Sequence, residues 1–303
     1  MNKIKVLYIA GWGRSGSTVL GNILGEVQGF FHVGEMRHMW GRLASGRVCG
    51  CGKLFAECPF WGPCLQKTFG GVSPEFAQEV INKREATSKT KHFLLNRKKM
   101  IANSTEFRAI LHKLYAGIKE QAGCDVIVDG SKFPGYGYLL ANNADIELHT
   151  IHLVRDPRAT AYSWYYRQKK TNDKADGSEN KMDKHSPLKD SLLWNLRNRL
   201  IQNIWQKEGL KYHLVNYETF VREPQKVVRG ICEFVGQPDA KLPFTSESEV
   251  HLNPNHTVAG NPNRLKTGNV KLKVDNEWET KMNGALKGMV TLLTAPTRHR
   301  FGY

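Results

Sequence analysis

Short apolar runs alternate with helical patterns along most of this 303-residue chain. Compact apolar runs predict strands at residues 5–10, 30–33, 124–129, 148–154 and 213–215. Helical spacing predicts helices at residues 19–24, within 74–122, at 188–206 and 224–235, and one that opens at Pro157. Strands that alternate with helices are typical of a parallel sheet covered on both faces. The pattern therefore predicts a three-layer α/β fold with a central parallel sheet flanked by helices.

Three stretches depart from this alternation, although no repeat or long linker divides the chain. Residues 45–122 begin with glycines and cysteines and continue as basic helices, which predicts an insertion into a single domain, residues 1–303. Residues 169–187 are nearly all polar and predict a mobile loop. Residues 250–273 are rich in Asn, Pro and Gly, so we expect little regular structure there.

The chain is strongly basic. It contains 44 lysines and arginines against 28 aspartates and glutamates, a formal net charge of +16. An excess of this size favours an anionic partner, namely nucleic acid, an anionic membrane or a highly phosphorylated small molecule, while a basic surface that only aids solubility is the alternative. Hydrophobic residues make up 40% of the chain, which excludes wholesale disorder.

The apolar run at residues 1–10 is too short for a secretory signal. No stretch approaches the roughly 18 apolar residues that span a bilayer. We therefore expect a cytoplasmic protein without a membrane span, whose cysteines are reduced. Cys49, Cys51, Cys58 and Cys64 lie close together, but their spacing differs from that of paired C-x-x-C knuckles. We interpret them as free buried thiols in preference to a four-thiolate zinc site.

The clearest chemical motif is GWGRSGST at residues 11–18, between a predicted strand and a predicted helix. Glycines let the backbone fold around an anion, and the N–H groups that begin a helix point toward it. The motif is similar to the Walker A loop G-x-x-x-x-G-K-[ST], but Ser17 occupies the position of the lysine that nucleoside triphosphates require. The sequence therefore predicts a P-loop-like phosphate cradle in which Arg14 contacts a different tetrahedral anion.

A second motif, RDPRATAYS, occupies residues 155–163. Arg155 ends a predicted strand, at the edge where open α/β sheets bind ligands. Ser163 follows about two helical turns later and shares a face with the start of its helix. The pair predicts a second phosphate site, and a structural ion pair is the alternative for the arginine.

Together and in this order, the two motifs resemble those of the sulfotransferases that use 3′-phosphoadenosine-5′-phosphosulfate (PAPS). VNYE at residues 215–218 and HTVAGNPNR at residues 256–264 resemble two later segments of that family, and Cys-Gly-Cys-Gly segments occur in its bacterial members. The chain is therefore similar to the bacterial, carbohydrate- and tyrosylprotein-like branch. The resemblance implies a P-loop-like α/β fold, PAPS as co-substrate, adenosine 3′,5′-diphosphate as product and no metal requirement.

The resemblance also implies which residues hold the co-substrate. It assigns the 5′-phosphosulfate to Arg14, Ser15, Gly16, Ser17 and Thr18, and the 3′-phosphate to Arg155 and Ser163. Weaker contacts are expected from Tyr217, Asn261 and Arg264, although residues of an Asn-Pro segment also serve as turn formers.

Three residues are the catalytic candidates. Glu35 follows Arg14 by the separation that the catalytic glutamate shows in tyrosylprotein-type members, and it would take the acceptor proton. A glutamate favoured by a helix start is the alternative, and His32 and His38 are rival bases. Lys132, which follows a strand as the family's lysine does, would act with Arg14 on charge that builds on the bridging oxygen. An ordinary solvated lysine is its alternative.

We therefore expect sulfuryl transfer from PAPS to a hydroxyl or amine of a carbohydrate or a small molecule of secondary metabolism. The acceptor pocket is expected within residues 36–113 and 169–187. A P-loop kinase of a small metabolite is one alternative. A non-enzymatic polyanion-binding protein that uses the basic run at residues 83–108 is another, but this run lacks a nucleic-acid-binding motif, so no nucleic acid partner is expected.

Overall fold

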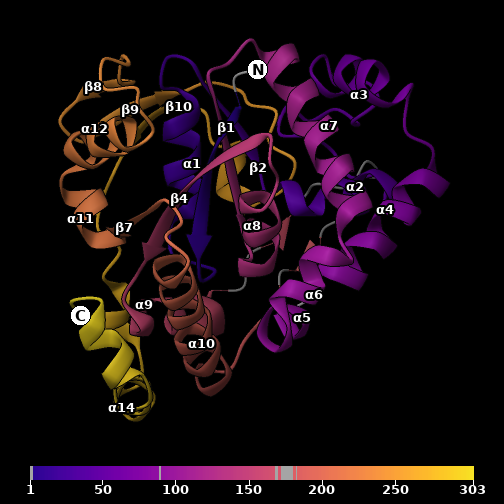
Figure 1. Cartoon of the computed structure of the whole chain (residues 1–303). Coiled ribbons are helices and arrows are strands. Elements are labelled where there is room, and N and C mark those ends of the chain that lie inside the picture. Colours follow the sequence, from indigo (N-terminus) through magenta and orange to yellow (C-terminus); the bar gives the residue numbers. More distant parts are fainter. Residues whose placement is uncertain (1–2, 89, 168–169, 172–179, 182) are drawn as a thin grey trace.

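The computed structural model describes residues 3–88, 90–167, 170–171, 180–181 and 183–303. Its centre is a parallel five-stranded sheet with the strand order β2-β3-β1-β4-β7. These strands are β1 (Ile4–Gly11), β2 (Phe30–Gly34), β3 (Val126–Lys132), β4 (Ile146–Val154) and β7 (Tyr212–Asn216). Helices cover both faces (Figure 1). The predicted three-layer α/β fold is confirmed.

Side chains of β1 alternate between two hydrophobic clusters. Val6 and Tyr8 pack with α7 (Thr105–Ala122), α8 (Pro134–Ala141) and α10 (Pro187–Lys207). Leu7 and Ile9 pack on the other face with α1 (Ser17–Gly25) and α12 (Pro224–Phe234). All four side chains are fully buried. A central parallel strand is apolar on both faces for this reason, and its sequence reads as a continuous hydrophobic run.

The stretch at residues 36–122 is helical beyond its cysteine-rich segment. It contains η1 (Met36–His38), α2 (Met39–Ala44), α3 (Trp61–Phe69), α4 (Pro74–Thr87), α5 (Thr90–Leu95), α6 (Arg97–Ala102) and α7. Helices α3 to α7 lie on one side of the sheet, and α11 (Tyr217–Arg222) and α12 lie on the other (Figure 1). Among the described residues, no helix has both the length and the hydropathy needed to cross a bilayer.

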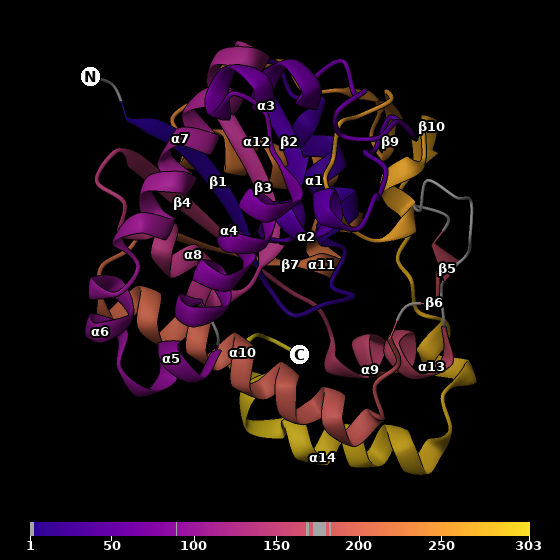
Figure 2. The same cartoon turned by 90° about the vertical axis from the view of Figure 1, so that its right-hand side faces the viewer.

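Three further helices pack together at the end of the molecule toward which the strands point. They are α9 (Pro157–Tyr166), α10 and α14 (Gly284–Arg300), and α13 (Glu277–Lys281) contacts α9 (Figure 2). The mobile loop predicted at residues 169–187 lies largely outside the described residues. Within it, β5 (Lys170–Thr171) pairs antiparallel with β6 (Asn180–Lys181).

One prediction about regular structure is wrong. Residues 250–273 were expected to be irregular, but β9 (Glu249–Leu252) and β10 (Gly268–Lys271) pair antiparallel, and β8 (Phe244–Ser246) completes a small sheet. Val250 and Leu252 are buried against the α12 side of the core. An alternation of four residues is too short to recognise in the sequence, and burial of these two side chains stabilises the sheet.

Candidate functional site

The carboxyl ends of all five parallel strands meet around one cavity of about 650 Å³. Each strand is followed by one residue that the sequence marks for the site: Arg14 after β1, Glu35 after β2, Lys132 at the end of β3, Arg155 after β4 and Tyr217 after β7. All five line the cavity. Parallel topology brings them together, because the ends of parallel strands share one edge of the sheet.

The glycine-rich loop forms the floor of this cavity. Gly16 precedes α1 with φ 87°, and a Cβ atom there would lie 2.5 Å from the ring of Tyr217, so only glycine fits. Ser17 and Thr18 begin α1 and line the cavity. The first N–H groups of a helix have no intrahelical partner and therefore attract an anion. Ser15 is buried beneath this lining, and its hydroxyl has no hydrogen-bond partner among the described residues.

Arg14 is the most exceptional residue of the loop. Nε, Nη1 and Nη2 of its guanidinium are buried and have no hydrogen-bond partner within the described part of the chain. The group stacks over the ring of Trp164 at 4.7 Å. Burial lowers the pKa of Arg14, and the carboxylates Glu35 and Asp190 oppose that effect. Buried donors of a cation are rarely left unsatisfied, so this arginine indicates an anion site.

Glu35 and Lys132 form an ion pair at the cavity wall. Burial alone would raise the pKa of Glu35, but the positive charges of Lys132 and Arg42 and the neighbouring His38 together hold it below its ordinary value. Glu35 is therefore ionised at neutral pH and able to accept a proton. Lys132 has a φ of 65°, a backbone conformation that costs a non-glycine residue roughly 1–2 kcal/mol.

The two rival histidines differ in position. His38 lines the cavity, and its Nε2 lies 3.6 Å from Oε2 of Glu35. Its pKa is lowered to about 4, chiefly by burial. His32 is packed beneath the loop against Gly21, does not line the large cavity, and has a pKa lowered by burial to about 3. Both imidazoles are uncharged at neutral pH, and of the two only His38 lines the large cavity.

Arg155 is held by groups from three segments. Its Nη1 donates to the carbonyl of Arg14 at 3.0 Å, its Nη2 donates to Oδ2 of Asp275 at 3.0 Å, and its guanidinium lies over the ring of Tyr217 at 4.4 Å. Its Nε has no partner among the described residues. Ser163, on α9, lines the same cavity. The two residues predicted to hold the 3′-phosphate thus line the same cavity, and the carboxylate of Asp275 is bound to the arginine.

That carboxylate, Asp275, was not anticipated from the sequence. It also accepts hydrogen bonds from Arg167 at 2.5 and 2.9 Å. Burial would raise its pKa, but Arg167 and Arg155 lower it to about 2, so it is ionised at all ordinary pH values. Asp275 lies 120 residues from Arg155 in a polar segment without a recognisable motif, so no local signal could have identified it.

Aromatic side chains and a further cation line the part of the cavity next to the loop. The rings of Trp12 and Trp164 are 6.0 Å apart, and His185 stacks on Trp164 at 4.1 Å. Arg197 lies over the ring of Trp12 at 5.0 Å and over that of Phe133 at 4.3 Å, and burial lowers its pKa to about 10. The position of Trp164 beside Ser163 could have suggested a role, whereas Arg197 resembles any solvated residue of a basic helix.

The segment at residues 255–264, called the covering segment below, packs against the start of α1 beside the loop. The N–H group of Asn261 donates to Oγ1 of Thr18 at 3.4 Å, and Asn261 lines the cavity. Arg264 is 2% exposed and does not line the large cavity. Its guanidinium donates to the carbonyls of Thr257 at 2.9 Å and Val48 at 3.4 Å, so it secures the covering segment. The chemical roles of these residues stay predictions.

Known proteins provide an independent comparison. A model of the sulfotransferase domain family matches residues 136–288, just over half of the chain. The match includes Arg155, Ser163 and Tyr217 and excludes the glycine-rich loop. No curated protein sequence is significantly similar to the chain.

Solved structures match over nearly the whole length. The sulfotransferase domain from the Synechococcus PCC 7002 olefin synthase has a TM-score of 0.54 and 22% identity, covering 100% of this chain and 96% of that one. The sulfotransferase domain from the curacin biosynthetic pathway has a TM-score of 0.49 and 18% identity, with coverages of 97% and 98%. A sulfotransferase from Alicyclobacillus acidocaldarius has a TM-score of 0.42 and 12% identity, with coverages of 96% and 92%. At 22% identity, the similarity to the first of these structures shows a shared fold and nothing more.

Proposed function

The chain belongs to the sulfotransferase domain family, and from this premise we propose that it transfers a sulfuryl group from PAPS to a hydroxyl or amine of a small-molecule or carbohydrate acceptor. The observation that carries this proposal is the guanidinium of Arg14, in the loop that precedes α1, which is buried and lacks a partner within the described ranges. A bound anion would satisfy it, and charge-assisted hydrogen bonds of this kind are the strong ones. The 5′-phosphosulfate of PAPS is such an anion.

The second phosphate of the nucleotide has a separate place in this proposal. Arg155 and Ser163 would hold the 3′-phosphate, and Arg155 offers its Nε, which has no partner among the described residues. Asp275 competes for the same guanidinium, so binding of the phosphate would weaken its contact with Asp275. Tyr217 packs against both Gly16 and Arg155 and would connect the two phosphate sites.

Transfer then proceeds by in-line attack at sulfur, by analogy with phosphoryl transfer. The acceptor oxygen forms a bond to sulfur while the bond from sulfur to the bridging oxygen breaks, leaving its electron pair on the 5′-phosphate. Glu35, ionised at neutral pH, accepts the acceptor proton. Lys132 leaves Glu35 and, with Arg14, stabilises the charge on the bridging oxygen. No step requires a metal ion.

We place the acceptor in the part of the cavity that is lined by His38, Phe133, Leu193 and Arg197. This lining combines an apolar surface with the cation of Arg197, which suits a small acceptor. We propose that the chain is one catalytic domain and that the helical stretch at residues 45–122 is an insertion into it. A hydroxyl on a carbohydrate or secondary metabolite fits such a lining.

Calorimetric titration with adenosine 3′,5′-diphosphate tests the proposal directly. We expect tight binding without added metal to the intact chain, and at least tenfold weaker binding to Arg155→Ala, since a charge-assisted phosphate contact is worth roughly 1.5–3 kcal/mol. Arg97→Ala is the matched control, because Arg97 pairs with Glu208 away from the cavity. A preference for magnesium-ATP would favour a kinase instead. Salt-sensitive binding of heparin with no affinity for either nucleotide would favour a polyanion-binding protein.

A further inference from the structure

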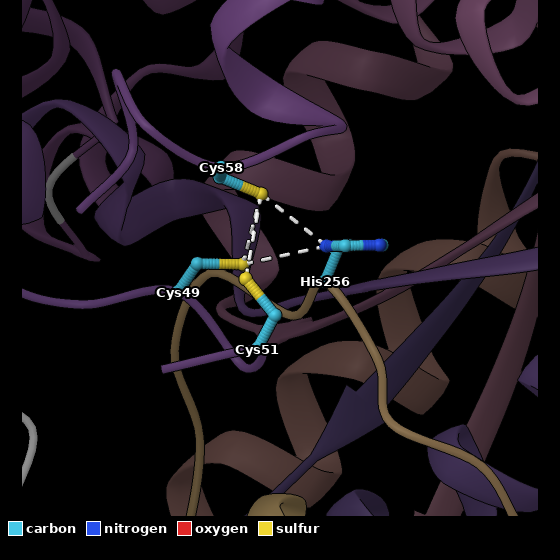
Figure 3. Close-up of side chains that lie close together, drawn as sticks. All are labelled: Cys49, Cys51, Cys58 and His256. Atoms are coloured by element: carbon cyan, nitrogen blue, oxygen red, sulfur yellow. Dashed lines mark hydrogen bonds between the residues drawn. The ribbon is translucent and has the colours of Figure 1, made fainter. Parts of the chain in front are cut away.

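Three cysteines and one histidine converge outside the cavity. Cys49, Cys51 and Cys58 come from the segment before α3, and His256 comes from the covering segment near the carboxyl end of the chain. In Figure 3 the three sulfur atoms and the imidazole point toward a common centre. The four candidate ligand atoms all lie within 4.8 Å of one another.

Four of the six distances between these atoms fall between 3.2 and 3.9 Å, close to those of a tetrahedron around an ion. Cys58 Sγ lies 3.6 Å from Sγ of both Cys49 and Cys51. Nδ1 of His256 lies 3.2 Å from Cys58 Sγ and 3.9 Å from Cys49 Sγ. Thiolates about 2.3 Å from a tetrahedral zinc ion are about 3.8 Å apart. A disulfide would bring two sulfurs to about 2.05 Å, and all three cysteines are free thiols.

Local backbone structure orients the first two ligands. The N–H group of Cys49 donates to the carbonyl of Lys53 at 2.8 Å, and that of Gly52 donates to the carbonyl of Cys49 at 2.9 Å. Gly52 adopts a φ of 83°, which closes the turn at little cost. This tight turn presents the thiols of Cys49 and Cys51 to one centre, although a single residue separates them.

The other two ligands are fixed from their surroundings. The N–H group of Trp61, at the start of α3, donates to Cys58 Sγ at 3.5 Å, and a helix start of this kind stabilises a thiolate. The indole N–H of the same tryptophan donates to the carbonyl of His256 at 2.7 Å. The ring of Phe60 stacks on the imidazole at 5.6 Å. Metal sites are typically oriented by such outer contacts.

We propose that Cys49, Cys51, Cys58 and His256 bind one zinc ion in a structural Cys₃His site. Four protein ligands leave no open coordination position, which separates a structural zinc from a catalytic one. Thiolates with one imidazole select zinc over the hard cations that prefer oxygen. Cys64 is not part of the group. The sequence interpretation considered Cys64 as the fourth ligand and therefore missed His256, which lies 198 residues beyond Cys58.

The zinc ion would fasten the covering segment to the cysteine turn. Gly50 N–H already donates to the carbonyl of Thr257 at 2.9 Å, next to His256. The carbonyl of Ala259 in the same segment accepts from the N–H group of Glu35 at 3.1 Å. Loss of the metal would therefore loosen the cover over the cavity. This consequence rests on the proposed function, whereas metal binding does not.

Metal content of the full chain, purified without chelators and measured by inductively coupled plasma mass spectrometry, tests the site. We expect one zinc per chain, and at least a tenfold loss in Cys58→Ser and in His256→Ala. Cys64→Ser is the matched control and should keep its zinc, because Cys64 is equally buried but lies outside the cluster. Equal loss in Cys64→Ser, or a disulfide among Cys49, Cys51 and Cys58 in the purified chain, would overturn the proposal.

A second measurement uses the unmodified chain and does not depend on how the variants fold. Chelator-treated protein titrated with Co²⁺ should develop the thiolate-to-cobalt charge-transfer band and the intense visible bands of tetrahedral coordination, saturating at one ion per chain. Added Zn²⁺ should then bleach both. Absence of these bands, together with zinc-free purified protein, would overturn the site.

Nucleotide binding separates this inference from the proposed function. Titration of zinc-loaded and zinc-free protein with adenosine 3′,5′-diphosphate should give weaker binding to the zinc-free form. One zinc per chain without any binding of the nucleotide would support the metal site and contradict the proposed function. Binding of the nucleotide by a chain that takes up neither Zn²⁺ nor Co²⁺ would do the reverse.

Discussion

Arg14 and Lys132 are the two non-glycine residues with a positive φ among the described residues. Both are candidates for contacting the transferred group, and both belong to segments that leave the end of a strand. Such conformations persist only where surrounding structure enforces them, and they gather at functional sites. At the residue scale, backbone strain thus occurs at the two positions that direct cations into the cavity. The strain supports the roles proposed for both residues.

A buried carboxylate behind the cavity makes folding stability depend on pH. Asp190 on α10 accepts hydrogen bonds from Trp12 at 2.6 Å and Thr160 at 3.0 Å, yet burial raises its pKa to about 7. An unfolded aspartate has a pKa of about 3.9. Between these two values the folded state binds more protons than the unfolded state, so the free energy of unfolding falls as pH rises from about 4 to about 7.

Asp190→Asn should remove this contribution. Asparagine can still accept from Trp12 through Oδ1, and its amide can donate to the hydroxyl of Thr160, which then donates to the carbonyl of Pro157. Asparagine does not titrate, so the fall in the free energy of unfolding between pH 4 and 7 should be smaller in the variant, by on the order of 2–4 kcal/mol. Urea unfolding of both proteins across this range provides the measurement, and Asp239→Asn, at an exposed position, is the control. Asp129, whose pKa is raised by burial to about 6, contributes equally to both proteins and cancels. Parallel pH profiles for the two would contradict the assignment.

At the scale of elements, the glycine-rich loop depends on the helix that follows β7. Gly16 combines a left-handed backbone with contact to the ring of Tyr217, whereas Gly209 has a φ of 63° and open space where a Cβ atom would lie. Gly16→Ala should therefore cost the conformational penalty, roughly 1–2 kcal/mol, and a steric penalty in addition. Gly209→Ala should cost the conformational penalty alone.

Thermal unfolding of the two alanine variants measures this difference. Gly16→Ala should also weaken binding of adenosine 3′,5′-diphosphate, because the ring of Tyr217 must move away from the loop and from Arg155. Gly209→Ala should bind it as the parent does. Equal destabilisation of both variants would mean that the ring of Tyr217 moves aside without a loss in the free energy of unfolding.

At this scale, the sequence predicts those features whose residues are neighbours in the chain. The central strands were recognisable because strands buried on both faces are continuous apolar runs. The loop at residues 11–18 was recognisable because its glycines, at positions 11, 13 and 16, lie close together in the sequence. Strands β9 and β10 were missed because each has only four residues, too few for an alternation to be recognised. Asp275 and His256 were missed for a different reason, because each acts on residues more than a hundred positions away.

At the scale of the whole molecule, the cavity concentrates the positive charge of a chain with a formal net charge of +16. The cations that line it are Arg14, Lys132, Arg155, Arg167, Lys189 and Arg197, whereas the carboxylates in its lining come from Glu35, Asp183 and Asp275. Clefts lined by one sign of charge attract ligands of the opposite sign and accelerate their association. Such an excess suits a nucleotide with several negative charges better than it suits a neutral ligand.

Asp275 opposes this excess and joins the segment after β10 to α9 and to the end of β4, through Arg167 and Arg155. Asp275→Asn should have two effects of opposite sign. Loss of two partly buried ion pairs should lower the free energy of unfolding by roughly 1 kcal/mol, while removal of a negative charge beside Arg155 should tighten binding of adenosine 3′,5′-diphosphate several-fold. Asp145→Asn, at the exposed surface, should change neither.

Thermal unfolding and calorimetric titration of the same preparations separate the two effects. The gain in affinity should shrink as salt is added, because the repulsion that the substitution removes is screened. Weaker nucleotide binding by Asp275→Asn would instead mean that the carboxylate holds Arg155 in its binding geometry. Asp275 would then be a positioning residue, and the 3′-phosphate would bind, without displacing it, through Nε of Arg155, which has no partner among the described residues.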